Sequence, residues 1–346
     1  MVENCLLKII QLLPPEIAHK LSLKALDILH KTGGYKLFIE QITENNTKQV
    51  MGINFPNPLG LAAGLDKNAE HISGLSAVNF GFLEVGTVTP IGQLGNPKPR
   101  LFRIPKYHAL INRMGINNKG VDYAIKNISA LDNKPVIGIN IGKNHDTPNA
   151  TAIDDYVYCF KKVYIHADYI TVNLSCPNTS NLTELQNNEF LDDMLTKLKL
   201  TQQALAKQHK VYRPLVIKIS PDLDNKQLVK IGHAVIEHAI DGIITTNTSI
   251  HRHNIPSTVQ HAAQKGGLSG KPIANVSAKS LDMLSNIVKN KAAIISCGGI
   301  WSEQDVTDRL NAGADLLQIY TAFIYQGISL ISKLVNSLHK DNYAKV

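Results

Sequence analysis

The sequence lacks several features that mark other classes of protein. Its four cysteines lie far apart and form no CxxC pair, which argues against a disulfide scaffold or a zinc ribbon and fits a reducing cytosol. No apolar run approaches the roughly 18 residues of a membrane-spanning helix. The amino terminus has no small-residue cleavage site of a signal peptide. No block rich in Lys and Arg is interleaved with aromatic residues, so we expect no nucleic-acid partner.

The composition is that of a folded protein. The chain has 346 residues, of which 44% are hydrophobic and 18% charged, too apolar for an intrinsically disordered chain. That length allows one large domain or two ordinary ones. Lys and Arg number 36 against 28 Asp and Glu, a net charge of +8. This balance suits an anionic ligand or an anionic membrane surface, and it is equally typical of an ordinary basic surface.

Residues 1–45 differ in composition from the rest of the chain. Leu and Ile gather before Pro14-Pro15 and then recur at helical spacing as far as Gly33-Gly34. We predict an amino-terminal amphipathic helical segment, residues 1–45, followed by a main domain, residues 46–346. Two interpretations of the segment stay open: a helical hairpin packed on the main domain, or a surface that touches lipid or an apolar ligand. His19 is interpreted as a packing or helix-surface residue.

From residue 55, short runs rich in Val, Ile or Leu alternate with longer helical patterns. Most runs are almost wholly apolar, as strands buried on both faces must be. The eight predicted strands span residues 59–63, 83–87, 136–141, 169–173, 215–219, 242–246, 293–296 and 316–319. Helical patterns span 154–166, 188–207, 225–237, 278–288, 303–312 and 328–338. This alternation predicts an α/β fold, a (β/α)8 TIM barrel. An open doubly wound sheet is the alternative, weakened because no GxGxxG motif follows the first strand.

Polar residues stand at the predicted strand ends, where a (β/α)8 barrel has its active site. Gly298-Gly299 and Tyr320-Thr321 end the last two strands, the usual phosphate site of such barrels. Lys218, near the end of a buried strand, would either offset negative charge on a reduced cofactor ring or form a Schiff base. Cys176 follows the fourth strand and is suited to act as base or nucleophile in an electropositive site. The other three cysteines are interpreted as structural.

Amide side chains near these strand ends match a ligand with alternating N–H and C=O groups, such as a pyrimidinedione. They come from residues 112–118 and from Asn173, Asn178 and Asn247. Arg113 or Lys67 would suit a carboxylate. Together these strand ends predict a site for a polar, planar ligand.

Longer motifs carry a family resemblance. They are Asn57-Pro-Leu-Gly-Leu-Ala-Ala-Gly-Leu-Asp-Lys67, Glu84-Val-Gly-Thr-Val-Thr-Pro90, Asn112-Arg-Met-Gly115, Asn140-Ile-Gly-Lys-Asn144, Asn173-Leu-Ser-Cys-Pro-Asn178 and Gln318-Ile-Tyr320. In this order along nearly the whole chain, they resemble dihydroorotate dehydrogenase. Leu13-Pro-Pro-Glu-Ile-Ala-His19 is similar to the quinone-dependent, membrane-associated class. Soluble relatives that use fumarate or NAD lack that segment.

The resemblance implies an FMN-dependent oxidoreductase of pyrimidine (UMP) biosynthesis. It would oxidise (S)-dihydroorotate to orotate and pass the electrons to a quinone. We also predict a monomer without a metal, attached peripherally to the cytoplasmic side of the cell membrane. The residues that it implies for FMN are Ala63, Gly64, Leu65, Asp66, Lys67, Thr87, Asn140, Asn173, Lys218, Thr246, Gly270, Gly299, Tyr320 and Thr321. Those that it implies for the substrate are Lys67, Asn112, Arg113, Met114, Gly115, Ile116, Asn173, Asn178, Asn247 and Thr248.

The position of the general base falls on Cys176, and here the chain departs from its class. The quinone-dependent class usually has serine at this position, whereas the soluble class has cysteine. This departure bears on the pH profile and on the electron acceptor. Three alternatives stay open: a soluble-class dehydrogenase that uses fumarate or NAD, a phosphate-binding barrel lyase or isomerase that uses Lys218, and a non-catalytic flavin-binding protein.

Overall fold

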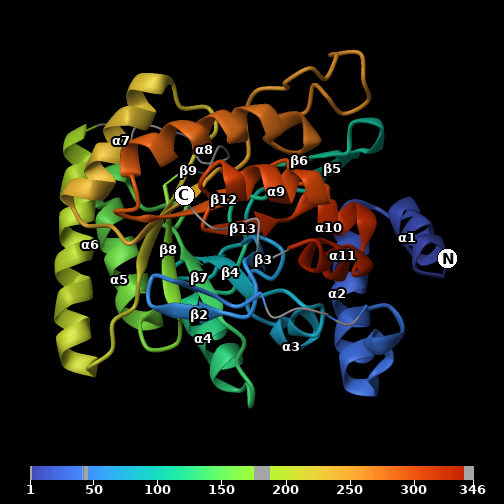
Figure 1. Ribbon diagram of the computed structural model, residues 1–346, viewed down its shortest axis with the longest axis horizontal. Helices are drawn as coiled ribbons and strands as arrows, with labels where there is room; N and C mark the ends of the chain where they lie inside the picture. The colour runs from blue at the N-terminus through green and yellow to red at the C-terminus, as the bar shows by residue number, and fades with distance from the viewer. Residues whose placement is uncertain (1, 41, 43–45, 175–187, 339–346) are drawn as a thin grey trace.

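The centre of the structure is a closed barrel of eight parallel strands (Figure 1). The computed structural model describes residues 2–40, 42, 46–174 and 188–338. In order around the barrel the strands are β3 (Leu59–Leu61), β4 (Phe82–Val88), β7 (Ile137–Ile141), β8 (Tyr169–Asn173), β9 (Leu215–Ile219), β10 (Gly242–Thr245), β12 (Ala293–Cys297) and β13 (Leu316–Ile319), which returns to β3. The predicted (β/α)8 fold is confirmed, and the open doubly wound alternative is wrong.

Helices cover the outside of the barrel. They are α3 (Ile72–Ser76), α4 (Val121–Ser129), α5 (Ala152–Val163), α6 (Asn188–His209), α7 (Asn225–Glu237), α8 (Ala274–Val288), α9 (Glu303–Asn311), α10 (Thr321–Gln326) and α11 (Ser329–Asn336). Helix α7 begins where the pattern predicted because Asp224 and Gln227 form a capping box. Helix α9 begins at a similar box of Ser302 and Asp305.

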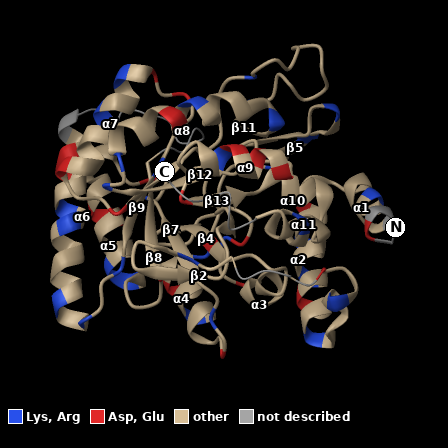
Figure 2. Cartoon of the chain, viewed as in Figure 1, with Lys and Arg blue, Asp and Glu red and all other residues tan. Residues whose placement is uncertain are grey.

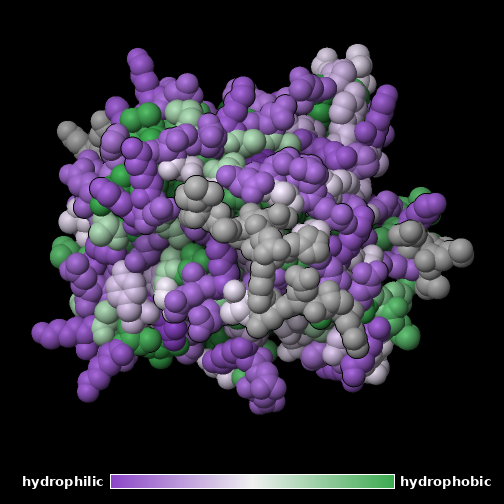
Figure 3. Space-filling view, viewed as in Figure 1, coloured by the Kyte–Doolittle hydropathy of each residue, from purple (hydrophilic) through white to green (hydrophobic). Residues whose placement is uncertain are grey.

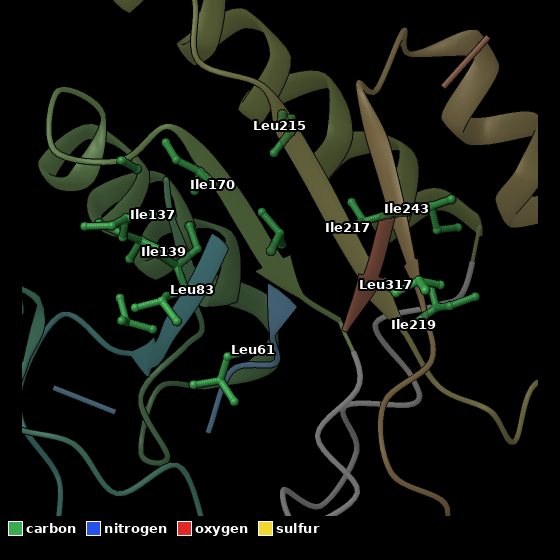
Figure 4. Close-up of a cluster of buried hydrophobic side chains, with 14 of the residues drawn as sticks. Leu61, Leu83, Ile137, Ile139, Ile170, Leu215, Ile217, Ile219, Ile243 and Leu317 are labelled. Carbon is green, nitrogen blue, oxygen red and sulfur yellow. The ribbon is translucent and has the colours of Figure 1, made fainter. Parts of the chain in front are cut away.

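Side chains alternate between the two faces of each strand. Figure 4 shows Leu215, Ile217 and Ile219 along β9, and all three belong to the core shared with the surrounding helices. Residues of the opposite face fill the interior of the barrel: Phe82, Tyr169, Val216, Ile244, Ile295 and Leu316. Phe55, from the hairpin of β1 (Lys48–Val50) and β2 (Ile53–Phe55), packs in the same cluster. The cluster leaves no room for a ligand in the interior, so a ligand must bind at the carboxyl ends of the strands.

A small antiparallel sheet lies beside the carboxyl ends of the barrel strands. It consists of β5 (Leu101–Ile104), β6 (Ala109–Asn112) and β11 (Gly267–Gly270), in the order β11-β6-β5. The one-turn helix η2 (Pro105–Tyr107) connects β5 to β6. The sequence patterns did not predict this sheet. It holds residues 112 and 270 at the mouth of the barrel.

The amino-terminal segment forms two helices, α1 (Val2–Leu12) and α2 (Pro15–Thr32), followed by the short η1 (Gly34–Leu37). Arg103 of β5 ties their junction down, because its guanidinium donates to the carbonyls of Gln11, at 2.7 Å, and of Leu13. Glu3 accepts a 2.6 Å hydrogen bond from the backbone N–H of Ile328. These contacts pack the amino-terminal helices against the main domain.

Much of the apolar surface of α1 and α2 nevertheless faces outward. The exposed residues are Leu6, Ile9, Leu12, Ile17, Leu21 and Ile28, and Figure 3 shows apolar surface beside these helices. Figure 2 shows Lys and Arg mixed with Asp and Glu along α2 and α6. None of the helices in the described part of the chain is long and apolar enough to cross a bilayer.

Candidate functional site

A cavity of about 1130 Å³ opens at the carboxyl ends of the barrel strands. It takes residues from all eight strands or the loops that follow them, and from the small sheet. Eighteen of the residues predicted for cofactor or substrate line it: Ala63, Gly64, Lys67, Thr87, Asn112, Met114, Gly115, Ile116, Asn140, Asn173, Lys218, Thr246, Asn247, Thr248, Gly270, Gly299, Tyr320 and Thr321. Most of the residues predicted for the site therefore lie together at the carboxyl ends of the strands.

Three predicted residues lie apart from the cavity lining. The Asp66 carboxylate is buried and accepts from the backbone N–H groups of Glu70 and His71, at 2.9 and 2.7 Å. Leu65 is buried towards the amino-terminal helices. These contacts give both residues a part in packing the loop after β3.

Arg113 also turns away from the cavity. Its guanidinium donates to the Gln264 side chain at 2.7 Å and to the Pro99 carbonyl at 2.9 Å, and it lies over the Phe102 ring at 4.7 Å. Two further predicted residues, Cys176 and Asn178, lie outside the described residues.

Polar side chains at the floor of the cavity orient one another. The Thr87 hydroxyl donates to Asn140 Oδ1 at 2.6 Å and accepts from Asn173 Nδ2 at 3.2 Å. Asn247 Nδ2 in turn donates to Asn173 Oδ1 at 3.1 Å. Because each amide is fixed by a neighbour, the cavity presents a defined arrangement of donors and acceptors to a ligand.

Lys218 and Lys67 bring positive charge to the cavity. Lys218 on β9 is almost fully buried, and its Nζ lies 4.0 Å from Glu84 Oε1. Lys67 Nζ donates to the Gly64 carbonyl at 2.6 Å. Burial, and then the nearby Arg100, lower the pKa of Lys67 to about 8. Anionic groups of a ligand would be favoured here.

Glu84 lies beside the cavity-lining residues, and the sequence interpretation gave it no role. It lies within a quoted motif, and the signal that it offered was a carboxylate in the middle of an otherwise apolar strand. No part of it is exposed. It does not line the cavity, but three of the side chains in contact with it do.

One side of the cavity has the shape expected of an anion site. Gly298 and Gly299 have φ angles of 112° and 77°, where glycine is favoured. A Cβ on Gly299 would come within 2.3 Å of Ala274 Cα, so a side chain does not fit there. The Thr321 hydroxyl is hydrogen-bonded to the Ser269 hydroxyl at 2.8 Å. This corner can hold a phosphate group through backbone and hydroxyl groups.

A second cavity, of about 1110 Å³, lies under α1 and α2. Most of its lining is apolar, with Leu7, Leu23, Leu26 and Phe323 among the residues. His19 also lines it, and burial together with the charge of Lys67 lowers the pKa of this imidazole to about 3. His19 is therefore neutral at physiological pH and packs among apolar groups.

The two cavities meet a common groove between α2 and the barrel. The groove shares Lys67 and Tyr320 with the polar cavity, and His19 and Leu65 with the apolar one. A polar ligand and an apolar ligand can therefore bind to neighbouring parts of the same molecule.

Two of the cysteines interpreted as structural can be placed. Cys159 and Cys297 are buried and free, and burial raises the pKa of both thiols. Cys159, on α5, packs in the main hydrophobic core. Cys297 ends β12 and touches the polar cavity, but its raised pKa makes it a poor thiolate.

Comparisons with known proteins identify the family of the chain. A family model described as dihydroorotate dehydrogenase matches residues 46–341. The dihydroorotate dehydrogenase (quinone) of Idiomarina loihiensis is 48% identical over 324 residues, 94% of this chain and 96% of the relative. That of Nitrosospira multiformis is 44% identical over 342 residues, 99% and 97% of the two chains.

Solved structures are similar as well. The crystal structure of DHODH from Eimeria tenella in complex with ferulenol has a TM-score of 0.81 and 34% identity, and covers 90% of this chain and 89% of that chain. The ligand-free type from the same organism has a TM-score of 0.83 and 35% identity, with 93% of both chains covered. The chain therefore belongs to the dihydroorotate dehydrogenase family.

Proposed function

We propose that the protein is a quinone-dependent dihydroorotate dehydrogenase. It oxidises (S)-dihydroorotate to orotate in de novo pyrimidine biosynthesis, with FMN as hydride acceptor and a quinone as electron acceptor. The observation that carries the proposal is the pair of adjoining cavities, one polar at the barrel mouth and one apolar under α1 and α2. An enzyme that joins a polar substrate to an apolar electron acceptor needs both.

The donor set of the polar cavity fits FMN. Asn140, Asn173 and Thr246 offer amide and hydroxyl groups to the polar edge of the flavin ring, and Lys218 offers a positive charge where the reduced ring becomes anionic. Gly299 and Thr321 form the corner suited to the phosphate. When bound, the flavin accepts a hydride and passes the electrons on.

The substrate lies on the side of the cavity formed by residues 112–116, Lys67, Asn247 and Thr248. Amides at Asn112 and Asn247 match the N–H and C=O groups of the pyrimidine ring, and Lys67 matches its carboxylate. Cys176 removes the proton from C5 as hydride leaves C6. A thiol is far more acidic than an unassisted hydroxyl, so it is the easier base to activate. This role rests on the motif alone.

Quinone reaches the flavin through the apolar cavity. In this proposal residues 1–45 serve membrane and quinone access, and residues 46–346 form the FMN-binding catalytic domain. The exposed apolar face of α1 and α2 rests on the bilayer, which holds the protein peripherally at the cytoplasmic side of the cell membrane. Lys8, Lys20, Lys24 and Lys31 add attraction to anionic lipid.

Anaerobic mixing tests the proposal. The purified protein should be yellow, dihydroorotate should bleach it, and a soluble quinone analogue should restore the colour within turnover time. Fumarate and NAD should restore it far more slowly. A protein that takes up no FMN, or a bleached protein that fumarate or NAD reoxidises faster than quinone, would overturn the proposal.

A further inference from the structure

Glu84 is a buried carboxylate that only accepts hydrogen bonds. Its Oε1 accepts from Asn140 Nδ2 at 2.8 Å. Its Oε2 accepts from Gln318 Nε2 at 2.7 Å, from the Tyr169 hydroxyl at 3.1 Å and from the Thr171 hydroxyl at 3.2 Å. Four side-chain donors thus converge on the two carboxylate oxygens of Glu84. Burial and the neighbouring Glu84 hold the pKa of Tyr169 well above its usual range, so the phenol stays a donor.

The large polar side chain of Tyr169 and apolar side chains of the barrel interior lie near Glu84. The Tyr169 ring crosses the barrel over Gly138, where a Cβ would lie 2.1 Å from the ring. The same interior also contains Val216, Ile244 and Ile295, which need no polar partner. An ion in such a place costs several kcal/mol to desolvate, and an apolar side chain would avoid that cost. Core packing alone therefore does not account for the carboxylate.

The polarity of the cavity floor follows from Glu84. Because its carboxylate cannot donate, the NH₂ group of Asn140 must face it, and the Asn140 carbonyl must face Thr87. Thr87 then donates to Asn140 and accepts from Asn173, whose carbonyl is left to accept from Asn247. All four bonds of this relay point toward Glu84. The relay joins a residue outside the cavity to the amides proposed to hold flavin and substrate.

Glu84 also supplies negative charge beside Lys218, whose Nζ lies 4.0 Å from Oε1. Lys218 lines the cavity and Glu84 does not. The Glu84 carboxylate, which lies outside the cavity, therefore partly balances the positive charge that Lys218 presents to the bound flavin.

We propose that Glu84 is a positioning residue that fixes the donor and acceptor pattern of the cavity through the Asn140–Thr87–Asn173–Asn247 relay and sets the charge around the flavin through Lys218. The inference rests on the proposed function. It assigns Glu84 no contact with substrate or cofactor.

Replacement of Glu84 by glutamine has a defined consequence. Three donors face Oε2 and one faces Oε1, so the single amide oxygen of Gln turns to the three and its NH₂ group meets Asn140. Asn140 must then flip, and the relay reverses. The positive charge near the flavin is also no longer balanced by Glu84, which favours the reduced, anionic ring.

The measurements are the midpoint potential of bound FMN and the affinity of the oxidised holoenzyme for orotate. In Glu84→Gln we expect flavin reduction to become more favourable by about tenfold, a positive shift of about 30 mV for a two-electron couple. Orotate should bind about tenfold more weakly. Thr171→Val removes one donor but keeps the charge and the relay, so it should leave both values at the wild-type level even where it lowers the melting temperature.

A second substitution separates the relay from general damage. Adding Asn140→Asp to Glu84→Gln supplies a carboxylate that accepts from both the glutamine and Thr87, which restores the direction of the relay. Orotate affinity should return toward the wild-type value, a non-additive result that two unrelated defects would not give. Glu84→Asp keeps the charge, so its flavin potential should stay near the wild-type value.

Unchanged potential and orotate affinity in Glu84→Gln, beside a competent wild type, would overturn this inference alone. If Glu84→Gln does not fold, orotate affinity is compared in Glu84→Asp and Thr171→Val. A change in Glu84→Asp no larger than the change in Thr171→Val would likewise overturn this inference alone. A wild-type protein that binds neither FMN nor orotate would overturn the proposed function and this inference together.

Discussion

At the scale of single residues, Cys176 is the position at which this chain differs from the usual quinone-dependent pattern. As the general base it would act on the C5 proton and contribute little to binding. Cys176→Ala should therefore slow flavin reduction by dihydroorotate by about 10²–10⁴-fold while orotate still binds. Stopped-flow bleaching of the flavin measures this. Cys176→Ser should recover its rate only at higher pH, and an unchanged rate in the alanine variant would remove Cys176 from the mechanism.

Lys67 gives the second prediction at this scale. Its pKa is lowered to about 8, so the ammonium is charged below that pH and neutral above it. Affinity for the orotate carboxylate should then be constant below about pH 8 and should fall by up to tenfold for each pH unit above it. Titration of the holoenzyme with orotate across this range shows the slope. Lys67→Arg stays charged and should abolish the slope, so a slope that persists in that variant would assign it to another group.

At the scale of elements, local patterns predicted the barrel and missed the small sheet. The strands β8, β9 and β13 and the helix α7 have the predicted bounds, because continuous apolar runs and the alternation with helices are visible within a few residues. β11 instead pairs with β6, which lies about 155 residues earlier in the chain. No local period records such a pairing. The short α3 and α10 have too few residues to show one.

The same limit applied to the site. Residues at strand ends, such as Thr87 and Asn140, were predicted because the fold alone sends them to one rim. Arg113 belongs to a loop whose direction depends on the small sheet, and the structure turns its side chain toward Gln264. Glu84 was missed because only the closed barrel brings its partners from β7, β8 and β13 together.

A prediction at this scale concerns helix α9 and the turn after β12, which is part of the corner proposed to hold the phosphate. Arg309 of α9 is buried and donates to the carbonyls of Ala274 and Gly298, at 2.7 and 3.2 Å, and to the Ser277 hydroxyl at 2.8 Å. It thus braces the turn after β12 from behind and adds positive charge near it. Arg309→Met should weaken FMN binding about tenfold.

Riboflavin, which lacks the phosphate, is the control ligand for Arg309. Its affinity should change less than twofold in Arg309→Met, because the ring contacts lie elsewhere in the cavity. Fluorescence titration of the apoprotein with both flavins gives the two values. Equal losses for FMN and riboflavin would mean that Arg309 supports the fold in general and not the phosphate corner.

At the scale of the whole molecule, the amino-terminal helices have one side buried against the barrel and one apolar side exposed. Their inner side packs on the barrel through buried Ala18, Leu23 and Leu26, while Ile9 and Leu12 on α1 stay 56% and 85% exposed. Apolar exposure of this kind weakens solubility and needs a partner. In the proposed function, a bilayer would cover the outer side and supply the quinone to the apolar cavity at the inner side. Membrane attachment and electron transfer would then depend on the same two helices.

The double variant Ile9→Glu/Leu12→Glu tests this arrangement in the full-length protein. Burial of one such side chain contributes about 1.5–3 kcal/mol, so two charged replacements should weaken binding to anionic phospholipid vesicles at least tenfold. Both residues are exposed, so the melting temperature and the bleaching by dihydroorotate should not change. Leu200→Glu, at a comparably exposed apolar residue on α6, is the control and should bind vesicles like the wild type. Equal vesicle binding by all three proteins would place the membrane contact elsewhere, and the outward apolar face of α1 would then need another partner.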